Sequence, residues 1–130
     1  MFSASVEQGI ADNSTKYGVR PQLIRADIMH ESGGNALAVG DGGLALGPMQ
    51  VHPAACQEVG VDWHAIQAAI AAGDEPTAAR LGIEAGVAYL AKMLKLMGWD
   101  EAWALGAFNQ GETVIGKARS YATAVIDLIE

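Results

Sequence analysis

The feature that most constrains the fold is an apolar repeat in the second half of the chain. Its residues recur at intervals of four, three, four and three positions: Ile83, Val87, Leu90, Leu94 and Met97. This spacing places the side chains on one face of an α-helix, whereas a strand would point them to both faces. Pro76 suits the first turn of a helix, and Gly98 suits the position just after the end of a helix. We therefore expect one long helix between them.

Helical signals also cover most of the remaining sequence. Ser5 and Gln8 have the spacing of a capping box for a first helix that ends at Tyr17-Gly18. Further helices are expected from Arg20-Pro21 to Glu31, from Pro48 or Pro53 to about Val59, from Trp63 to Ala72, from Asp100 through Ala107, and from Glu112 or Thr113 onward.

One segment breaks this helical pattern. The residues SGGNALAVGDGGLALG (32–47) have no sustained period and too much glycine for a helix or a strand, which favours a loop or a short hairpin. We predict an all-α fold, α+β at most, with one such interruption. At 130 residues the chain is long enough for a single domain, residues 1–130, that buries a core without metals or disulfides.

Composition excludes several classes of function. The chain has 15 acidic and 8 basic residues, and its net charge is -7. The Lys and Arg residues are scattered, so no basic face is offered to nucleic acid. The apolar runs are far shorter than the ~20 residues that a membrane-spanning helix needs. Cys56 is the one cysteine, so no internal disulfide can form.

Glu31 is the residue whose position most suggests chemistry. It follows Ile24 and Ile28 at i+7 and i+3, on the apolar face and in the last turn of its helix. Burial and the negative end of the helix dipole both predict a raised pKa. A carboxylic acid that keeps its proton can act as a general acid on a glycosidic bond. The alternative is a structural glutamate that reaches water or pairs with Arg25 or Lys92.

No cofactor or metal is expected. Gly40-x-Gly42-x-x-Ala45 matches part of a dinucleotide fingerprint, but it lacks the strand before it and the helix after it. The glycines better suit close approach of the backbone to a ligand such as a sugar. His30-Glu31 would need a second histidine at Gly34 to bind zinc, and the three histidines lack metal-ligand spacing.

Other residues that could take part in chemistry also have a purely structural interpretation. His52 and Cys56 are four residues apart and leave Cys-His nucleophilic catalysis open, although an isolated cysteine is more often a small buried hydrophobe. Tryptophans can stack on sugars, but we expect Trp63, Trp99 and Trp103 to be buried or partly buried.

Several ordered motifs resemble those of soluble lytic transglycosylases and goose-type lysozymes. They are Glu31-Ser32-Gly33, Gly47-Pro48-Met49-Gln50-Val51, Ala88-Tyr89-Leu90, Ala107-Phe108-Asn109-Gln110-Gly111 and Tyr121. The resemblance covers about residues 20 to 126. It implies a compact helical lysozyme-like fold whose cleft binds peptidoglycan and cleaves the β-1,4 bond between N-acetylmuramic acid and N-acetylglucosamine.

The same resemblance implies roles for individual residues. Glu31 matches the catalytic acid. The residues implied to bind substrate or to shape the cleft are Ser32, Gly47, Met49, Gln50, Tyr89, Phe108, Asn109 and Tyr121. Tyr89 and Tyr121 also fall on apolar helix faces, from which their hydroxyls would orient the glutamate.

The motifs also depart from the family pattern. Pro48 replaces the leucine of the usual GLMQ, and Phe108 replaces the tyrosine of the usual AYN, which removes one hydroxyl. Gly40 stands where many transglycosylases have serine. Asp41 aligns with an acidic residue of goose-type lysozymes that is implicated in water activation, whereas the second acid of that family falls at His52.

We therefore predict a lytic transglycosylase that uses Glu31 to give 1,6-anhydro-muramyl products. The alternatives are a goose-type muramidase with water positioned by Asp41, and a non-catalytic glycan-binding domain. A monomer that acts on glycan strands of the cell wall, in the periplasm or outside the cell, is expected. Because MFSASVEQG lacks the features of a secretory signal, we expect a chain that is phage-encoded, exported by another route or excised from a longer protein.

Overall fold

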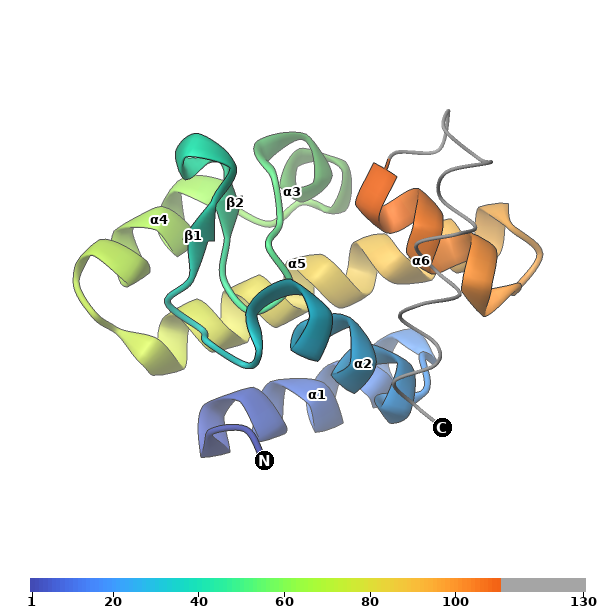
Figure 1. The fold of residues 1–130 in the computed structure, drawn as a ribbon, viewed down its shortest axis with the longest axis horizontal. Helices are drawn as coiled ribbons and strands as arrows, with labels where there is room; N and C mark the ends of the chain where they lie inside the picture. Colours follow the sequence, from blue (N-terminus) through green and yellow to red (C-terminus); the bar gives the residue numbers. More distant parts are fainter. Residues whose placement is uncertain (111–130) are drawn as a thin grey trace.

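The apolar repeat forms the central helix of the fold, as predicted. In a computed structural model, which describes residues 1–110, helix α5 (Glu75–Leu96) carries Pro76 in its first turn. The Asp74 side chain accepts a hydrogen bond of 3.2 Å from the Thr77 backbone N–H and so caps the helix. Helices α1, α3, α4 and α6 all pack against α5, which therefore lies at the centre of the core (Figure 1).

The other elements follow in nearly the predicted order. They are α1 (Ala4–Tyr17), α2 (Pro21–Ser32), β1 (Val39–Gly40), the 3-10 helix η1 (Asp41–Gly43), β2 (Ala45–Leu46), α3 (Pro53–Val59), α4 (Trp63–Ala71) and α6 (Glu101–Gln110). The prediction of a helical fold with one short hairpin is confirmed. Of the two prolines considered for the third helix, Pro53 begins it.

Some predictions fall beyond what the structure describes. The expected last helix from Glu112 or Thr113 and the candidate residue Tyr121 lie outside the described residues. Within α6, the side chains of Trp103, Ala107, Asn109 and Gln110 lie outside them as well. Over residues 1–110, no helix combines the length and the hydropathy that crossing a membrane requires.

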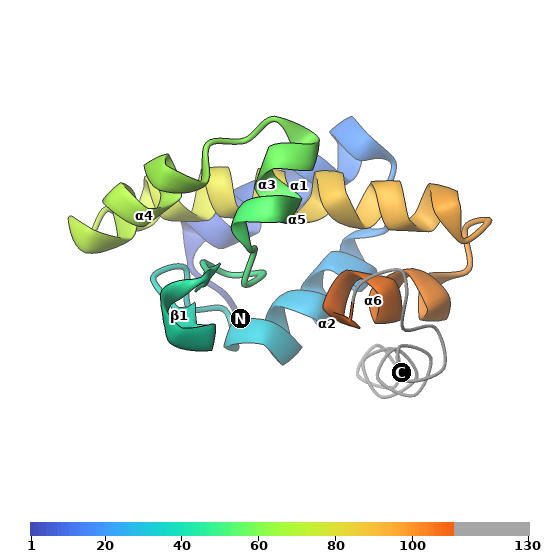
Figure 2. The ribbon, with the colours of Figure 1, turned by 90° about the horizontal axis from the view of Figure 1, so that it is seen from above.

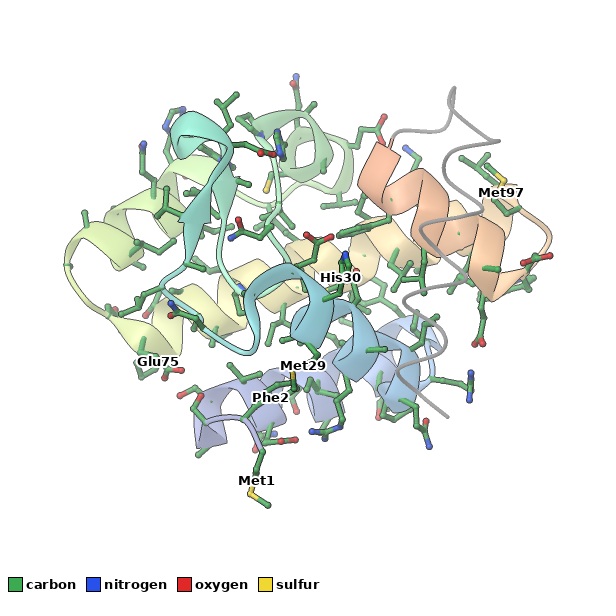
Figure 3. All side chains as sticks on the ribbon, viewed as in Figure 1. Met1, Phe2, Met29, His30, Glu75 and Met97 are labelled. Carbon is green, nitrogen blue, oxygen red and sulfur yellow. The ribbon has the colours of Figure 1, made fainter. Side chains whose placement is uncertain are left out.

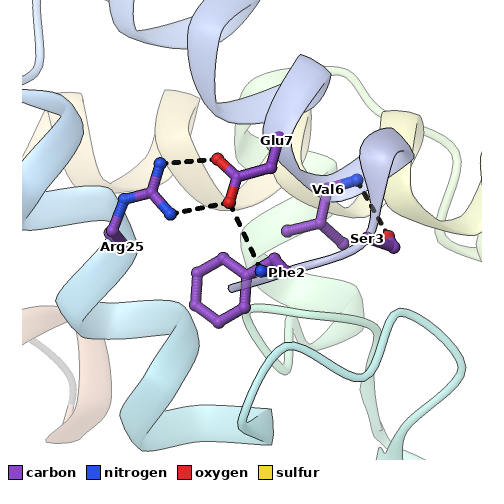
Figure 4. A network of polar contacts seen from close by, with 5 residues as sticks. All are labelled: Phe2, Ser3, Val6, Glu7 and Arg25. Atoms are coloured by element: carbon purple, nitrogen blue, oxygen red, sulfur yellow. Dashed lines mark hydrogen bonds and ion pairs between the residues drawn. The ribbon is translucent and has the colours of Figure 1, made fainter.

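The start of α1 differs from the prediction, because Ser3 caps the helix and Ser5 does not. The Ser3 Oγ accepts a hydrogen bond of 3.2 Å from the Val6 N–H. The Glu7 carboxylate accepts one of 3.3 Å from the Phe2 N–H and binds Arg25 of α2 through two contacts of 2.5 and 2.8 Å (Figure 4). The Arg25 guanidinium lowers the pKa of Glu7. This bidentate ion pair between Arg25 and Glu7 joins α1 to α2.

Trp99 contradicts the prediction that every tryptophan is at least partly buried, since it is 56% exposed. Gly98 and Trp99 both adopt left-handed φ values, of 63° and 66°. These two conformations follow the end of α5, so Trp99 does not continue the apolar face of that helix. Trp63 is partly buried, and its indole N–H donates a hydrogen bond of 3.1 Å to the Leu44 carbonyl, so for this residue the prediction is confirmed.

Met49 belongs to the core, where it joins the turn at 47–50 to the central helix. Its side chain is fully buried and lies against Gly86 of α5. A Cβ added to Gly86 would stand 2.7 Å from the Cβ of Met49, closer than side chains approach. Glycine at this position therefore lets the turn pack directly on the helix backbone. That packing fixes the place of Gln50, the next residue along the chain.

Gly86→Ala should lower the free energy of unfolding by about 1–3 kcal/mol, the usual cost of overpacking a core. Alanine is the better helix former by about 1 kcal/mol, but the overlap with Met49 outweighs this gain. Denaturant unfolding followed by circular dichroism measures the change. Lys95→Ala, at an exposed position of the same helix, is the control and should change stability by less than about 0.5 kcal/mol. An unchanged midpoint for Gly86→Ala would contradict the proposed packing.

Candidate active site

The glycine-rich segment folds into a hairpin that stands over the end of α2. Strands β1 and β2 are antiparallel, with Val39 opposite Leu46 and Gly40 opposite Ala45. The connection between them begins at Asp41, whose φ of 50° lies in the left-handed region. This conformation starts the tight η1 turn at the hairpin tip. It also sets the direction in which the Asp41 side chain leaves the backbone.

Gln50 closes the base of the hairpin with its side chain. The Gln50 Nε2 donates hydrogen bonds to the Gly47 carbonyl at 2.9 Å and to the Ala38 carbonyl at 3.2 Å. A Cβ on Gly40 would lie 2.5 Å from the Gln50 Oε1. Glycine at position 40 therefore makes room for the Gln50 amide.

Ser32 connects the end of α2 to the same turn. Its Oγ donates a hydrogen bond of 2.7 Å to the Pro48 carbonyl and accepts one of 3.2 Å from the Gly34 N–H. The helix stops at Gly33, whose φ is 65°. Figure 3 labels His30 in this last turn of α2, and Glu31 is the next residue. Ser32 thus fixes the distance between the helix end that carries Glu31 and the turn that carries Gln50.

A pocket of about 200 Å³ lies where the end of α2, the hairpin and α6 meet. It is lined by Glu31, Asp41, Ala45, Gln50, His52 and Phe108. Seen from above in Figure 2, α2 lies between the hairpin and α6. Small-molecule pockets usually measure about 300–1,000 Å³, so this one suits a part of an extended ligand. A larger pocket, of about 380 Å³, lies between α1 and the start of α5 and contains none of the predicted site residues.

Four of the predicted site residues therefore come together: Glu31, Asp41, Gln50 and Phe108. Met49 does not reach this pocket, because it is fully buried beneath the turn, and Gly47 is buried at the start of the turn. The Tyr89 ring packs against Phe108 with a centroid distance of 5.6 Å. Tyr89 thus supports the ring that lines the pocket. The Asn109 side chain and Tyr121 lie outside the described residues.

The two cations considered as structural partners of Glu31 bind other carboxylates. Arg25 pairs with Glu7, and the Lys92 Nζ lies 3.3 Å from the Glu58 carboxylate. Both cations considered for Glu31 therefore have another carboxylate as a partner. The place of Glu31 on the wall of the pocket favours a chemical role.

Cys-His catalysis is also excluded by the geometry. Cys56 is fully buried, and burial raises the pKa of its thiol to about 11, with a further contribution from Asp62. It therefore stays a neutral thiol at physiological pH and cannot serve as a nucleophile. His52 contacts Asp41 instead, with 2.9 Å between its Nε2 and the Asp41 Oδ2.

A second carboxyl, which the sequence analysis missed, lies one helical turn before Glu31. Asp27 is fully buried, and among the described residues neither of its carboxyl oxygens has a hydrogen-bond partner. Desolvation raises the pKa of Asp27 well above its ordinary value, and the charge of Glu31 raises it further. Asp27 therefore keeps its proton to a higher pH than an exposed aspartate does. The i to i+4 spacing of two acids on an apolar face was the available signal.

Asp27 should make the protein less stable as the pH rises. A carboxyl whose pKa is raised on folding adds no pH-dependent cost below its unfolded pKa, near 3.8. Above that pH the unfolded chain loses the proton and the folded chain keeps it, so stability falls by up to about 1.4 kcal/mol per pH unit until the folded pKa is reached. Asp27→Asn should remove this slope.

Thermal unfolding between pH 4 and pH 8 measures the effect. The melting temperature of Asp27→Asn relative to the unmodified protein should rise with pH, whereas the exposed control Asp12→Asn should show no such trend. A constant difference across this range would show that Asp27 is ionised in the folded protein.

Comparison with known proteins agrees with the fold and the motifs. The family described as the transglycosylase SLT domain matches residues 8–127, nearly the whole chain. The chain therefore belongs to the transglycosylase SLT domain family, and the predicted assignment to the soluble lytic transglycosylases is confirmed.

One solved structure has the same fold. It is the X-ray structure of an inactive mutant of the lytic transglycosylase Slt from Pseudomonas aeruginosa, with a TM-score of 0.75 and 18% sequence identity. The match covers 95% of this chain and 23% of that chain. At this identity the match speaks for the fold, and it confirms the predicted lysozyme-like helical architecture.

Proposed function

We propose that this chain cleaves the glycan strands of peptidoglycan as a lytic transglycosylase, with Glu31 as its one catalytic acid. The observation that carries the proposal is the position of Glu31 at the end of α2, on the wall of a pocket formed with the hairpin and α6. Membership of the transglycosylase SLT domain family supports it. The place of action is then the cell wall.

In the proposed reaction Glu31 acts first as an acid and then as a base. Its proton passes to the glycosidic oxygen while the bond from that oxygen to the anomeric carbon of the muramic residue breaks. The N-acetyl group of the substrate assists at this carbon. The ionised Glu31 then takes the proton of the muramic C6 hydroxyl, whose oxygen bonds to the anomeric carbon and closes the 1,6-anhydro ring. No water is consumed, and Glu31 regains its proton.

Other residues of the pocket would shape it around the sugar. Phe108 offers an aromatic ring that can stack on a sugar face, and Tyr89 holds that ring in place. The Gln50 amide is hydrogen-bonded to the Ala38 and Gly47 carbonyls, so its side chain would form a fixed part of the pocket wall. Asn109 and Tyr121 are proposed to complete the cleft on the strength of the motifs alone.

A hydrolase is the second candidate, because Asp41 lines the same pocket as Glu31. Two carboxylates facing one site are the usual equipment for glycoside hydrolysis. Here Asp41 would take a proton from a water whose oxygen bonds to the anomeric carbon, and the product would carry a reducing end. Mass spectrometry of digested peptidoglycan separates the two outcomes, because the hydrolytic product is heavier by one water.

Glu31→Gln should lower the rate of peptidoglycan solubilisation by about 100- to 10,000-fold, the range that a positioned general acid contributes. Glutamine keeps the shape of the side chain but has no acidic proton to donate. The similar Slt structure is described as that of an inactive glutamate-to-glutamine mutant, which agrees with this expectation.

Turbidity loss of purified peptidoglycan measures the rate, and circular dichroism checks that the variant folds. Glu58→Gln, at an exposed site on α3, is the matched control and should keep its activity. Activity of Glu31→Gln near that of the unmodified protein would refute Glu31 as the acid. Binding of glycan by the unmodified protein without any product would favour a non-catalytic domain.

A further inference from the structure

We propose that His52 decides the product of the reaction by holding Asp41 where it cannot activate water. The proposal rests on the proposed function, in which Glu31 opens the glycosidic bond. It assigns His52 a positioning role through Asp41 and no contact with the reacting atoms.

The geometry brings His52 and Asp41 together from two separate elements. Asp41 begins the η1 turn at the hairpin tip, and His52 directly precedes α3. Their side chains meet with 2.9 Å between the His52 Nε2 and the Asp41 Oδ2. Among the described residues, no other hydrogen bond is made by either side chain.

The His52 side chain is available for this contact because it does not cap its own helix. His52 stands at the N-cap position of α3 but makes no side-chain hydrogen bond to the first turn. Its ring is directed instead to the Asp41 carboxylate. The contact is a hydrogen bond when the ring is neutral with its proton on Nε2 and an ion pair when the ring is protonated. In both forms the ring nitrogen donates.

This contact opposes the chemistry that hydrolysis needs. A base must accept a hydrogen bond from the attacking water at about 2.6–3.2 Å. The bond to His52 occupies one oxygen of Asp41 and fixes the rotation of its carboxyl group. Asp41 is otherwise free to move, because its side chain is 69% exposed and stands on a turn at the hairpin tip. Removing His52 would therefore release the carboxylate toward a water in the pocket that it shares with Glu31.

Water competes with an attacking group that is already in place. The C6 hydroxyl belongs to the same sugar as the anomeric carbon, and such intramolecular groups react as if at very high concentration. Without a positioned base, water loses this competition and the 1,6-anhydro product forms. With Asp41 released, the water oxygen bonds to the anomeric carbon, Asp41 takes one of its protons, and solvent later restores the proton that Glu31 gave away.

The test is the ratio of the two products rather than the rate. Purified peptidoglycan is digested in water labelled with heavy oxygen, so that each hydrolytic event places the label on a reducing end and each transglycosylation leaves none. The unmodified protein should give mainly unlabelled 1,6-anhydro ends. In His52→Ala the labelled share should rise about tenfold, well inside the roughly 100-fold or more that a positioned base contributes.

Three further variants separate positioning from general damage to the cleft. His52→Gln keeps an N–H donor and should stay near the original ratio. Asp41→Asn should not raise the labelled share, and in the double variant His52→Ala with Asp41→Asn the rise should disappear. A purely structural role of His52 would slow the reaction but leave the ratio unchanged. The ratio can be read even from a slow variant, because more enzyme can be added.

Each outcome of this experiment supports or contradicts either the role of His52 or the proposed function. An unchanged ratio in His52→Ala, with 1,6-anhydro ends from the unmodified protein, overturns the role of His52 and leaves the proposed function intact. A rise that persists in the double variant also overturns it, because the water would then not depend on Asp41. Labelled reducing ends from the unmodified protein overturn the transglycosylase itself.

Discussion

The packing of a four-residue turn on the backbone of α5 underlies the rest of the site. Met49 anchors the turn in the core against Gly86, and the absence of a side chain at that glycine lets the two backbones approach. The same turn accepts a hydrogen bond from Ser32 at the end of α2, through the Pro48 carbonyl. Its last residue, Gln50, donates a hydrogen bond to the base of the hairpin. One close contact in the core thus places two walls of the pocket.

The pair of carboxyls on α2 bears on the proposed role of Glu31, which would first give a proton and then take one. Asp27 is buried and its pKa is raised, and a protonated Asp27 would not oppose the charge that Glu31 carries in the proposed reaction. An ionised Asp27 one turn away would instead make that charged state costly, because two like charges close together repel each other. The same burial has a cost in stability at neutral pH, as is common where function requires a polar group in a core.

The helices and the catalytic candidate were predictable because they depend on local pattern. The apolar period marks α5, and the register of Ile24, Ile28 and Glu31 marks the carboxyl that reaches the pocket. The burial of Met49 was not predictable, because it depends on a glycine in a helix far along the chain. The contact between Asp41 and His52 was not predicted from the sequence, for a related reason. It spans 11 residues and needs the left-handed φ of Asp41 at the hairpin tip.

Rigid and adjustable parts of the pocket divide the proposed chemistry between them. Glu31 stands on a helix whose end Ser32 ties to the turn at 47–50, so the proposed cleavage step depends on a group carried by the core. Asp41 stands on an exposed turn and is restrained by one side chain. The fate of the opened sugar would then depend on a contact that a single substitution can remove. If the proposed roles hold, a fold of this kind can yield a transglycosylase or a hydrolase without any change in its core, because the residue proposed to open the bond and the residue proposed to admit water belong to different elements.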